Sequence, residues 1–383
     1  MQQFNFPTVI YYGEGALQQF IEVLAEQNYQ KILIVTDKTL VDLGIIQLLT
    51  IPLDKHKIDY VLFSDCHPNP IEDDVIKGKQ VFLSQQCDCI VAMGGGAPMD
   101  VAKAILVLAT HPEPLGQYDD SQGGDALINQ PMPPLYAIPT TAGTGSEVGR
   151  SGIIIIKETG KKTIIFHPNL LPKIAVLEPT ITLKLPPSIT AATGIDAFTH
   201  CLEAYFSPLF HPMAKGIAIE GMQLIIESLP IATQHGENKQ ARAKMLLAAT
   251  MGATAFQKGL GMIHSMAHPL SAEFDTHHGL ANALLLPYAT QYLESQILTN
   301  SNQNKLAVVN QLFHDAGLGK PKLSETLQQF VEALGIKLGL CDHGIPESAF
   351  EKLSELAFQD PCHLTNMMPV TQADFLKVFE AAA

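Results

Sequence analysis

The chain has 383 residues, 46% of them hydrophobic, and a formal net charge of −14 at pH 7. This length is sufficient to bury a large core and favours two domains over one. The acidity argues against a nucleic-acid partner, because proteins that bind a phosphate backbone present clustered lysines and arginines to it.

The sequence also indicates where the protein works. No apolar run approaches the roughly 18 residues needed to span a bilayer, and the opening MQQFNFPTVIYYGEG lacks the basic and apolar segments of a signal peptide. The six cysteines are too scattered for a disulfide framework, so we expect reduced thiols. We therefore expect a cytoplasmic protein with no membrane partner.

In the first half of the chain, short β-branched segments alternate with helical stretches. This rhythm is typical of a parallel sheet covered by helices. The continuous apolarity of Ile32 to Val35 indicates a strand buried on both faces, as in a doubly wound, Rossmann-like sheet. We predict strands at residues 31–35, 60–63, 89–93, 135–138, 152–156 and 174–177.

After about Leu183 the β-branched segments give way to Leu, Ala, Met and Glu at helical spacing. We therefore predict an α/β domain over residues 1–182 and an all-helical domain over residues 183–383, with the active site in the cleft between them. The segment from His111 to Pro134 is too long and polar for a plain connector. We expect it to form a loop or lid beside that cleft.

A glycine turn follows the strand predicted at residues 89–93 and leads into a helical stretch at 101–108. Gly94, Gly95 and Gly96 have no side chains, so their peptide NH groups can approach a pyrophosphate at the positive end of a helix. The turn is not the GxGxxG fingerprint of dinucleotide-binding domains. Alone, it is as consistent with a simple tight turn as with a phosphate site.

A second loop of small residues, Pro139 to Glu147, follows the strand predicted at residues 135–138. Two such loops place amide and hydroxyl donors at the carboxyl edge of the sheet, where open α/β sheets bind their ligands. The alternative is a surface loop rich in Gly, Ser and Thr. Together the two loops favour a nucleotide site.

Asp37 lies just past the strand predicted at residues 31–35. A carboxylate there can accept hydrogen bonds from an adenosine ribose and repel a 2′-phosphate, which favours NAD over NADP. A helix cap explains an Asp at this place equally well.

The helical half contains pairs of potential metal ligands. Asp196 and His200 are four residues apart and so share one helix face, although such a pair is usually a surface contact. His264 and His268 repeat this spacing in a mostly apolar stretch, and His278 follows closely. Several partly buried imidazoles in a stretch with few charged residues are unusual without a binding partner. Binding of a divalent cation would explain them.

One carboxylate and three imidazoles form a donor set suited to Fe²⁺ or Zn²⁺, with a position left open for a substrate oxygen. We expect His268 to face the same cleft without ligating the cation. For His277 we expect a solvated or capping side chain. The predicted ligands are Asp196, His200, His264 and His278.

Motifs across nearly the whole chain resemble those of the iron-containing alcohol dehydrogenase family. They are YYGEGAL (11–17), HPNP (67–70), GGGAPMDVAKA (94–104), PTTAGTGSE (139–147), LPPSITAATGIDAFTHCLEAY (185–205) and HSMAHPLSAEFDTHHGLANALLLP (264–287). The four-ligand pattern is far more specific than the glycine turn.

The resemblance implies an NAD-binding first domain and a metal-binding, catalytic second domain. It implies iron as the metal, His268 beside the substrate as a catalytic residue, and a homodimer. It implies ligation by the four residues named above. The implied NAD contacts are Asp37, Asn69, Gly94, Gly95, Gly96, Ala97, Asp100, Thr140, Thr141 and Lys162.

Three positions depart from the family pattern. Ala97 stands where many members carry Ser, so one hydroxyl contact to the pyrophosphate is missing and cofactor affinity is in doubt. Glu178 replaces a frequent Asp, and His277 occupies a place often held by another residue. Both are compatible with the fold.

We therefore expect an oxidoreductase that interconverts a small alcohol and its aldehyde, or a ketone, with NAD(H). A cation would ease removal of the hydroxyl proton, and His268 would carry that proton. One alternative is an NAD-using carbon–oxygen lyase resembling dehydroquinate synthase, which typically has three metal ligands and many basic residues. A second alternative is a non-catalytic nucleotide sensor with a structural metal, although structural sites usually contain Cys.

Overall fold

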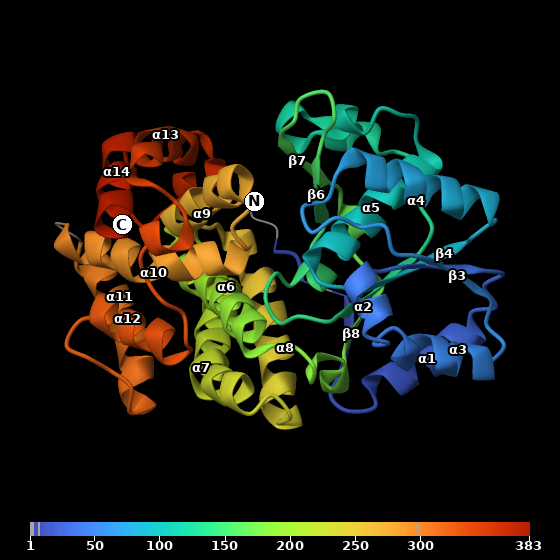
Figure 1. The fold of residues 1–383 in the computed structure, drawn as a ribbon, viewed down its shortest axis with the longest axis horizontal. Coiled ribbons are helices and arrows are strands. Elements are labelled where there is room, and N and C mark those ends of the chain that lie inside the picture. The colour runs from blue at the N-terminus through green and yellow to red at the C-terminus, as the bar shows by residue number, and fades with distance from the viewer. Residues whose placement is uncertain (1–3, 7, 297–298) are drawn as a thin grey trace. The chain divides into compact units, whose positions relative to one another are not determined.

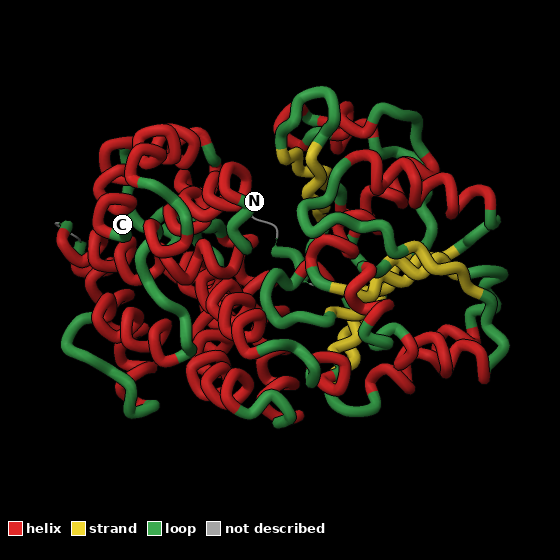
Figure 2. The backbone as a smooth tube through the Cα atoms, viewed as in Figure 1, coloured by secondary structure: helices red, strands yellow, loops and turns green. Residues whose placement is uncertain are grey.

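A computed structural model describes residues 4–6, 8–296 and 299–383. The chain divides into two compact units, and all strands of the described residues lie in the first of them (Figures 1 and 2). The first unit comprises Phe6–Thr141 and Gly145–Thr182. The second comprises Leu183–Ala383, with which Ala142–Thr144 and the described residues before Phe6 are grouped.

A six-stranded sheet forms the centre of the first unit. Its strands are β1 (Val9–Tyr12), β2 (Ile32–Val35), β3 (Tyr60–Phe63), β4 (Cys89–Gly94), β5 (Leu135–Pro139) and β8 (Ile174–Leu177). Their order is β1-β8-β5-β4-β2-β3, and every neighbouring pair is parallel. The predicted parallel sheet is confirmed.

Helices cover both faces of this sheet, because successive side chains of a strand point to opposite sides. In β4, Ile90 and Ala92 pack in one buried cluster with Phe82, whereas Val91 and Met93 pack in another. The first cluster includes residues of α4 and α5, and the second includes residues of α1 and α3 (Figure 1). The helices of this unit are α1 (Ala16–Glu26), α2 (Lys38–Asp42), α3 (Gln47–Lys55), α4 (Glu72–Ser84) and α5 (Gly96–Thr110).

One strand prediction is wrong in its partners. The segment predicted at residues 152–156 is β6 (Ser151–Ile155), which pairs antiparallel with β7 (Lys162–Phe166) in a separate two-stranded sheet. Its run of isoleucines resembles a strand buried on both faces, but its burial alternates and Ile153 is 37% exposed. The sequence prediction also omitted β1 and β7.

The segment from His111 to Pro134 contains three short 3-10 turns. They are Leu115–Tyr118, Asp120–Gln122 and Gly124–Leu127. The His111 ring holds the segment in place, because its Nε2 atom accepts hydrogen bonds from the peptide NH groups of Asn129 and Gln130, both at 3.0 Å. The prediction that it acts as a lid stays a prediction.

Helices are the regular secondary structure of the second unit, and none of its described residues lies in a strand, which confirms the prediction of a helical second half. None of its helices, nor any other described helix, is long and apolar enough to cross a membrane. Its helices are α6 (Pro187–Phe206), α7 (Pro212–Gln234), α8 (Lys239–Ala255), α9 (Met262–Phe274), α10 (His278–Ser295), α11 (Asn300–Asp315), α12 (Leu323–Ala333), α13 (Phe350–Gln359) and α14 (Gln372–Ala381).

Helix α6 is the central helix of this unit. Every residue from Thr190 to Phe206 is buried, and α7, α8 and α10 pack around it. Two lysines fix its C-terminal end: Lys258 Nζ donates to the Ala204 carbonyl at 2.8 Å, and Lys305 Nζ donates to the Phe206 carbonyl at 2.6 Å. The last carbonyls of a helix have no partner within the helix, so these ammonium groups satisfy them and oppose the negative end of its dipole.

A buried lysine of α5 bonds to the small-residue loop after β5 and to the start of β6. Lys103 Nζ donates to the Ser146 carbonyl and hydroxyl, both at 2.8 Å, and to the Ser151 carbonyl at 2.9 Å. Burial lowers the pKa of Lys103 to about 8, although the nearby Asp100 and Glu147 carboxylates oppose the shift. The three bonds tie α5, which begins at the glycine turn, to the loop that follows β5.

We expect Lys103→Met to lower the free energy of unfolding by about 3 kcal/mol, because the change leaves buried acceptors and a neighbouring carboxylate without their cation. Urea unfolding of the purified variant measures this loss. Lys161→Met, at an exposed position, is the matched control and should change stability by less than about 0.5 kcal/mol. Equal stability of the two variants would contradict the assignment.

Candidate active site

Helix α6 brings the first two predicted ligands together. Asp196 and His200 lie one turn apart on this helix and are both buried. The Oδ1 atom of Asp196 is 3.9 Å from the Nε2 atom of His200. Contrary to the usual surface pair, this carboxylate and imidazole face the interior of the helical unit.

The N-terminal parts of α9 and α10 add two imidazoles to the same carboxylate. The Nε2 atoms of His264 and His278 are 3.7 and 3.5 Å from the Oδ1 atom of Asp196. The rings of His200 and His264 are stacked with their centroids 4.6 Å apart. We call Asp196, His200, His264 and His278 the Asp196 cluster.

Two further residues hold this cluster in place. Glu203 accepts a hydrogen bond from His264 Nδ1 at 2.6 Å, and Asn282 Nδ2 donates to Asp196 Oδ1 at 2.8 Å. Sequence reasoning missed both. A signal was present, because Glu203 is seven residues after Asp196 on α6 and Asn282 is four after His278 on α10, so each lies on the face of a predicted ligand.

Burial and close contact perturb every member of the cluster. Burial lowers the pKa of His200 to about 4 and that of His278 well below its usual value. Burial alone would also lower the pKa of His264, but hydrogen bonds to Asp196 and Glu203 raise it to about 9. Burial disfavours the Asp196 carboxylate, yet the three imidazoles outweigh it and hold its pKa well below the usual range.

The ligand atoms of Asp196, His200 and His264 all lie within 4.8 Å of one another, and His278 adds a donor beside Asp196, an arrangement suited to a divalent cation. Donor atoms around a tetrahedral cation at the usual bond length of about 2.1 Å lie about 3.4 Å apart. The separations of 3.5, 3.7 and 3.9 Å from Asp196 Oδ1 are close to this spacing. The lowered pKa values of His200 and His278 leave these imidazoles neutral, the form in which they bind metals, whereas His264 would release a proton when it binds the cation.

His268 lies beside the cluster and contacts it through ring faces. Its ring stacks on that of His278, with centroids 5.3 Å apart and planes at 18°, and it is 6.1 Å from the ring of His264. Its Nδ1 atom is 2.7 Å from Asp360 Oδ2. His277, predicted to be solvated or capping, is the N-cap residue of α10, with an exposed side chain that makes no capping bond itself.

The two small-residue loops lie side by side at the carboxyl edge of the sheet. The peptide NH of Thr140 donates to the Gly94 carbonyl at 3.0 Å. A side chain at Gly94 would approach Pro98 Cγ to 2.6 Å, and one at Gly95 would lie 3.4 Å from Thr141 Oγ1. The close approach of the turn to α5 thus requires a glycine at position 94, whereas a side chain at Gly95 would make only ordinary contact with Thr141.

The remaining predicted cofactor residues make bonds within the first unit. Lys162 Nζ donates to Asn69 Oδ1 at 2.9 Å, which brings two of them together. Asp37 caps α2 by accepting from the Leu40 NH at 3.0 Å. Both carboxylate oxygens of Asp100 accept protein donors, Ser146 Oγ and the Ile153 NH, so this side chain supports the loops.

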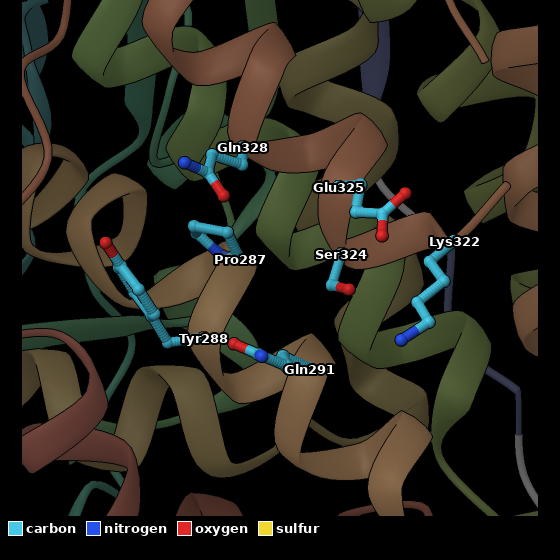
Figure 3. Close-up of a pocket in the computed structure, with 7 residues that line it drawn as sticks. All are labelled: Pro287, Tyr288, Gln291, Lys322, Ser324, Glu325 and Gln328. Atoms are coloured by element: carbon cyan, nitrogen blue, oxygen red, sulfur yellow. The ribbon is translucent and has the colours of Figure 1, made fainter. Parts of the chain in front are cut away.

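A polar pocket in the helical unit takes no part in this arrangement. It lies between α10 and α12 (Figure 3) and contains none of the predicted site residues. Its lining residues are Pro287, Tyr288, Gln291, Lys322, Ser324, Glu325 and Gln328.

Comparison with known proteins places this geometry in a family. Residues 7–179 match the model of the iron-containing alcohol dehydrogenases, and residues 190–383 match that of the C-terminal region of the same family. The chain belongs to the iron-containing alcohol dehydrogenase family. Its similarity to that family, predicted from the motifs, is confirmed.

Individual members of the family are similar to the chain over their whole length. The 4-hydroxybutyrate dehydrogenase of Cupriavidus necator is 36% identical, with 97% of each chain covered. Alcohol dehydrogenase 4 of Saccharomyces cerevisiae is 34% identical, covering 99% of this chain and 98% of the relative. The crystal structure of a 1,3-propanediol oxidoreductase superposes with a TM-score of 0.91 at 33% identity, with both chains fully covered.

Membership of this family establishes the class of reaction. The chain is an NAD-dependent oxidoreductase that interconverts alcohols and aldehydes, as the sequence predicted. This finding favours the dehydrogenase over the lyase alternative.

Gly279 provides a test of how the cluster is held together. A side chain there would lie 2.3 Å from the Ala192 carbonyl oxygen, so α10 touches α6 directly beside His278. We expect Gly279→Ala to push α10 away, lower stability by about 1–3 kcal/mol, and weaken metal binding at least tenfold. Thermal unfolding and metal titration measure these effects.

Gly216→Ala is the matched control, since this exposed glycine of α7 has nothing within 4 Å of an added side chain. It should keep wild-type metal binding and gain up to about 1 kcal/mol of stability. Wild-type metal binding by Gly279→Ala would refute the role of the close contact.

Proposed function

We propose that the Asp196 cluster holds a divalent cation and that the two small-residue loops hold NAD(H), so that the enzyme oxidises a small primary alcohol or reduces its aldehyde. A ketone is an alternative carbonyl substrate. The observation that carries the proposal is the convergence of three imidazole Nε2 atoms on one buried carboxylate oxygen.

The residues of the cluster have distinct roles in this proposal. Asp196, His200, His264 and His278 are the ligands, and Glu203 orients His264 by accepting its Nδ1 proton. A cation bound there would polarise the oxygen of the substrate as a Lewis acid. The family name favours Fe²⁺, while the donor set also suits Zn²⁺.

For the cofactor, NAD(H) would accept or donate the hydride. Peptide NH groups of Gly94–Gly96 at the start of α5, with Ala97, would face the pyrophosphate, and Thr140 and Thr141 would line the same edge. Asp37 would accept from the adenosine ribose through Oδ2, since its Oδ1 atom already accepts from the Leu40 NH. Asn69 and Lys162 would contact the cofactor as a hydrogen-bonded pair. We propose that Asp100 does not contact the cofactor but supports the loop after β5 through its bond with Ser146.

His268 is proposed to carry the proton. Its side chain is 35% exposed, whereas that of His264 is 1% exposed. It can therefore exchange a proton with solvent while it lies against the cluster. In alcohol oxidation it would accept the hydroxyl proton, and in aldehyde reduction it would return one.

We also propose a cytoplasmic homodimer. All six cysteines are free, as expected for a reducing compartment. Strand β1 lies at the edge of the sheet with Val9 56% and Tyr12 47% exposed. An edge strand presents unpaired NH and carbonyl groups, so a second copy of the chain can cover it.

An activity panel tests the proposed reaction. Protein purified without oxygen and loaded with Fe²⁺ or Zn²⁺ should produce NADH in proportion to the alcohol consumed, because hydride leaves the substrate permanently. Absorbance at the nicotinamide band measures this product. Turnover of a substrate without net NADH would support the lyase, and no turnover over the whole panel would support the sensor.

Substitution separates the metal ligands from the proton carrier. We expect His264→Ala to lose both bound metal and turnover, since it removes a buried ligand. We expect His268→Ala to keep the metal but to lower kcat by about 100-fold or more through loss of proton transfer. Metal analysis and steady-state kinetics of the same preparations distinguish the two. Full activity of His264→Ala would show that the ligand assignment is wrong.

A further inference from the structure

A second group of polar side chains lies next to the Asp196 cluster. His268, Asp360 and Cys362 place their potential ligand atoms within 4.8 Å of one another. Asp360 follows α13 and Cys362 is two residues beyond it, so both come from a part of the chain remote in sequence from α9. Asp360 and Cys362 were not among the predicted metal ligands, and neither was predicted to carry the proton.

The contacts of Asp360 divide its two oxygens between different donors. Oδ2 lies 2.7 Å from His268 Nδ1. Oδ1 accepts from Ser265 Oγ at 2.8 Å and from the Cys362 peptide NH at 2.9 Å. The Ser265 hydroxyl is itself fixed, because it accepts from the His363 NH at 2.8 Å. The carboxylate is therefore held in one orientation.

This orientation determines which nitrogen of His268 carries the proton. A peptide NH can only donate, so the atom facing Cys362 must be an acceptor. An ionised carboxylate can only accept, so its other oxygen accepts from Nδ1 and leaves Nε2 without a proton in the neutral ring. Burial disfavours the charge on Asp360, but its bonds to His268, Cys362 and Ser265 outweigh this and hold its pKa below the usual range.

We propose that Asp360 is a positioning residue, which fixes the ring and the tautomer of His268 so that Nε2 is the atom that exchanges a proton with the substrate. The inference rests on the proposed role of His268. When the alcohol is oxidised, Nε2 gains the hydroxyl proton and the ring becomes an imidazolium beside the Asp360 carboxylate. The reverse reaction returns that proton to the oxygen of the aldehyde and restores the neutral ring.

Asp360→Asn tests this assignment with little change in shape. The Cys362 NH still requires an acceptor, so the introduced amide should turn its oxygen to Cys362 and its NH₂ group to His268 Nδ1. His268 would then keep its proton on Nε2, where it cannot accept another. We expect kcat for alcohol oxidation to fall by about 100-fold or more, with metal content and the KM for alcohol unchanged within twofold.

Nitrogen NMR of the Zn²⁺-loaded protein gives a readout that does not depend on activity. In the wild type the His268 signals should show the proton on Nδ1, and in Asp360→Asn they should show it on Nε2. Asp315→Asn, at an exposed position on α11, is the matched control and should leave the tautomer and kcat unchanged. A wild-type ring protonated on Nε2 would overturn the inference.

A double substitution shows whether Asp360 acts through His268. If it does, Asp360→Asn combined with His268→Ala should be no slower than His268→Ala alone. If the two substitutions instead lower kcat by the product of their separate effects, or if Asp360→Asn loses its metal, Asp360 has a structural role and the inference is overturned. An inactive wild type with the proton on Nδ1 would instead contradict the proposed function while supporting the positioning by Asp360.

Discussion

A buried carboxylate surrounded by imidazoles is the interaction on which the helical unit depends. Asp196 lies within 4 Å of three Nε2 atoms, and no lysine or arginine ammonium or guanidinium forms an ion pair with it among the described residues. An ionised carboxylate in an apolar interior is costly unless opposite charge compensates it. The cation proposed above would provide that charge, so the same ion that would activate a substrate would also stabilise the packing of α6, α9 and α10.

Much of the fold was readable from local pattern. The unbroken apolar strands β2 and β4 predicted a sheet covered on both faces, and helical spacing predicted the second unit. The run of isoleucines in β6 misled the prediction. A strand with one buried face has the same composition as a strand buried on both faces when its exposed residues are also apolar. Ile153 and Ile164 are exposed isoleucines of this kind. The partner of a strand is a property of the whole chain that a single segment does not contain.

In the candidate site, too, contacts within one helix were predictable from the sequence and contacts between distant segments were not. Helical periodicity placed Asp196 with His200 and His264 with His268, because pairs four residues apart share a helix face. Asp360 was not predictable in this way, since it reaches His268 across 92 positions of sequence. Glu203 and Asn282 could have been found by extending the same periodicity. The two carboxylates Glu203 and Asp360 each accept from the Nδ1 atom of one histidine of α9, so both rings are oriented by acceptors outside the ligand set.

The unequal enclosure of the four clustered side chains has a consequence for how an ion would enter. Asp196, His200 and His264 are each less than 10% exposed, whereas the His278 side chain is 31% exposed. An incoming ion would therefore meet His278 first, and a departing one would leave it last. The rate of exchange would then follow the opening of the first turn of α10, while α6, whose C-terminal end is anchored by Lys258 and Lys305, stays in place.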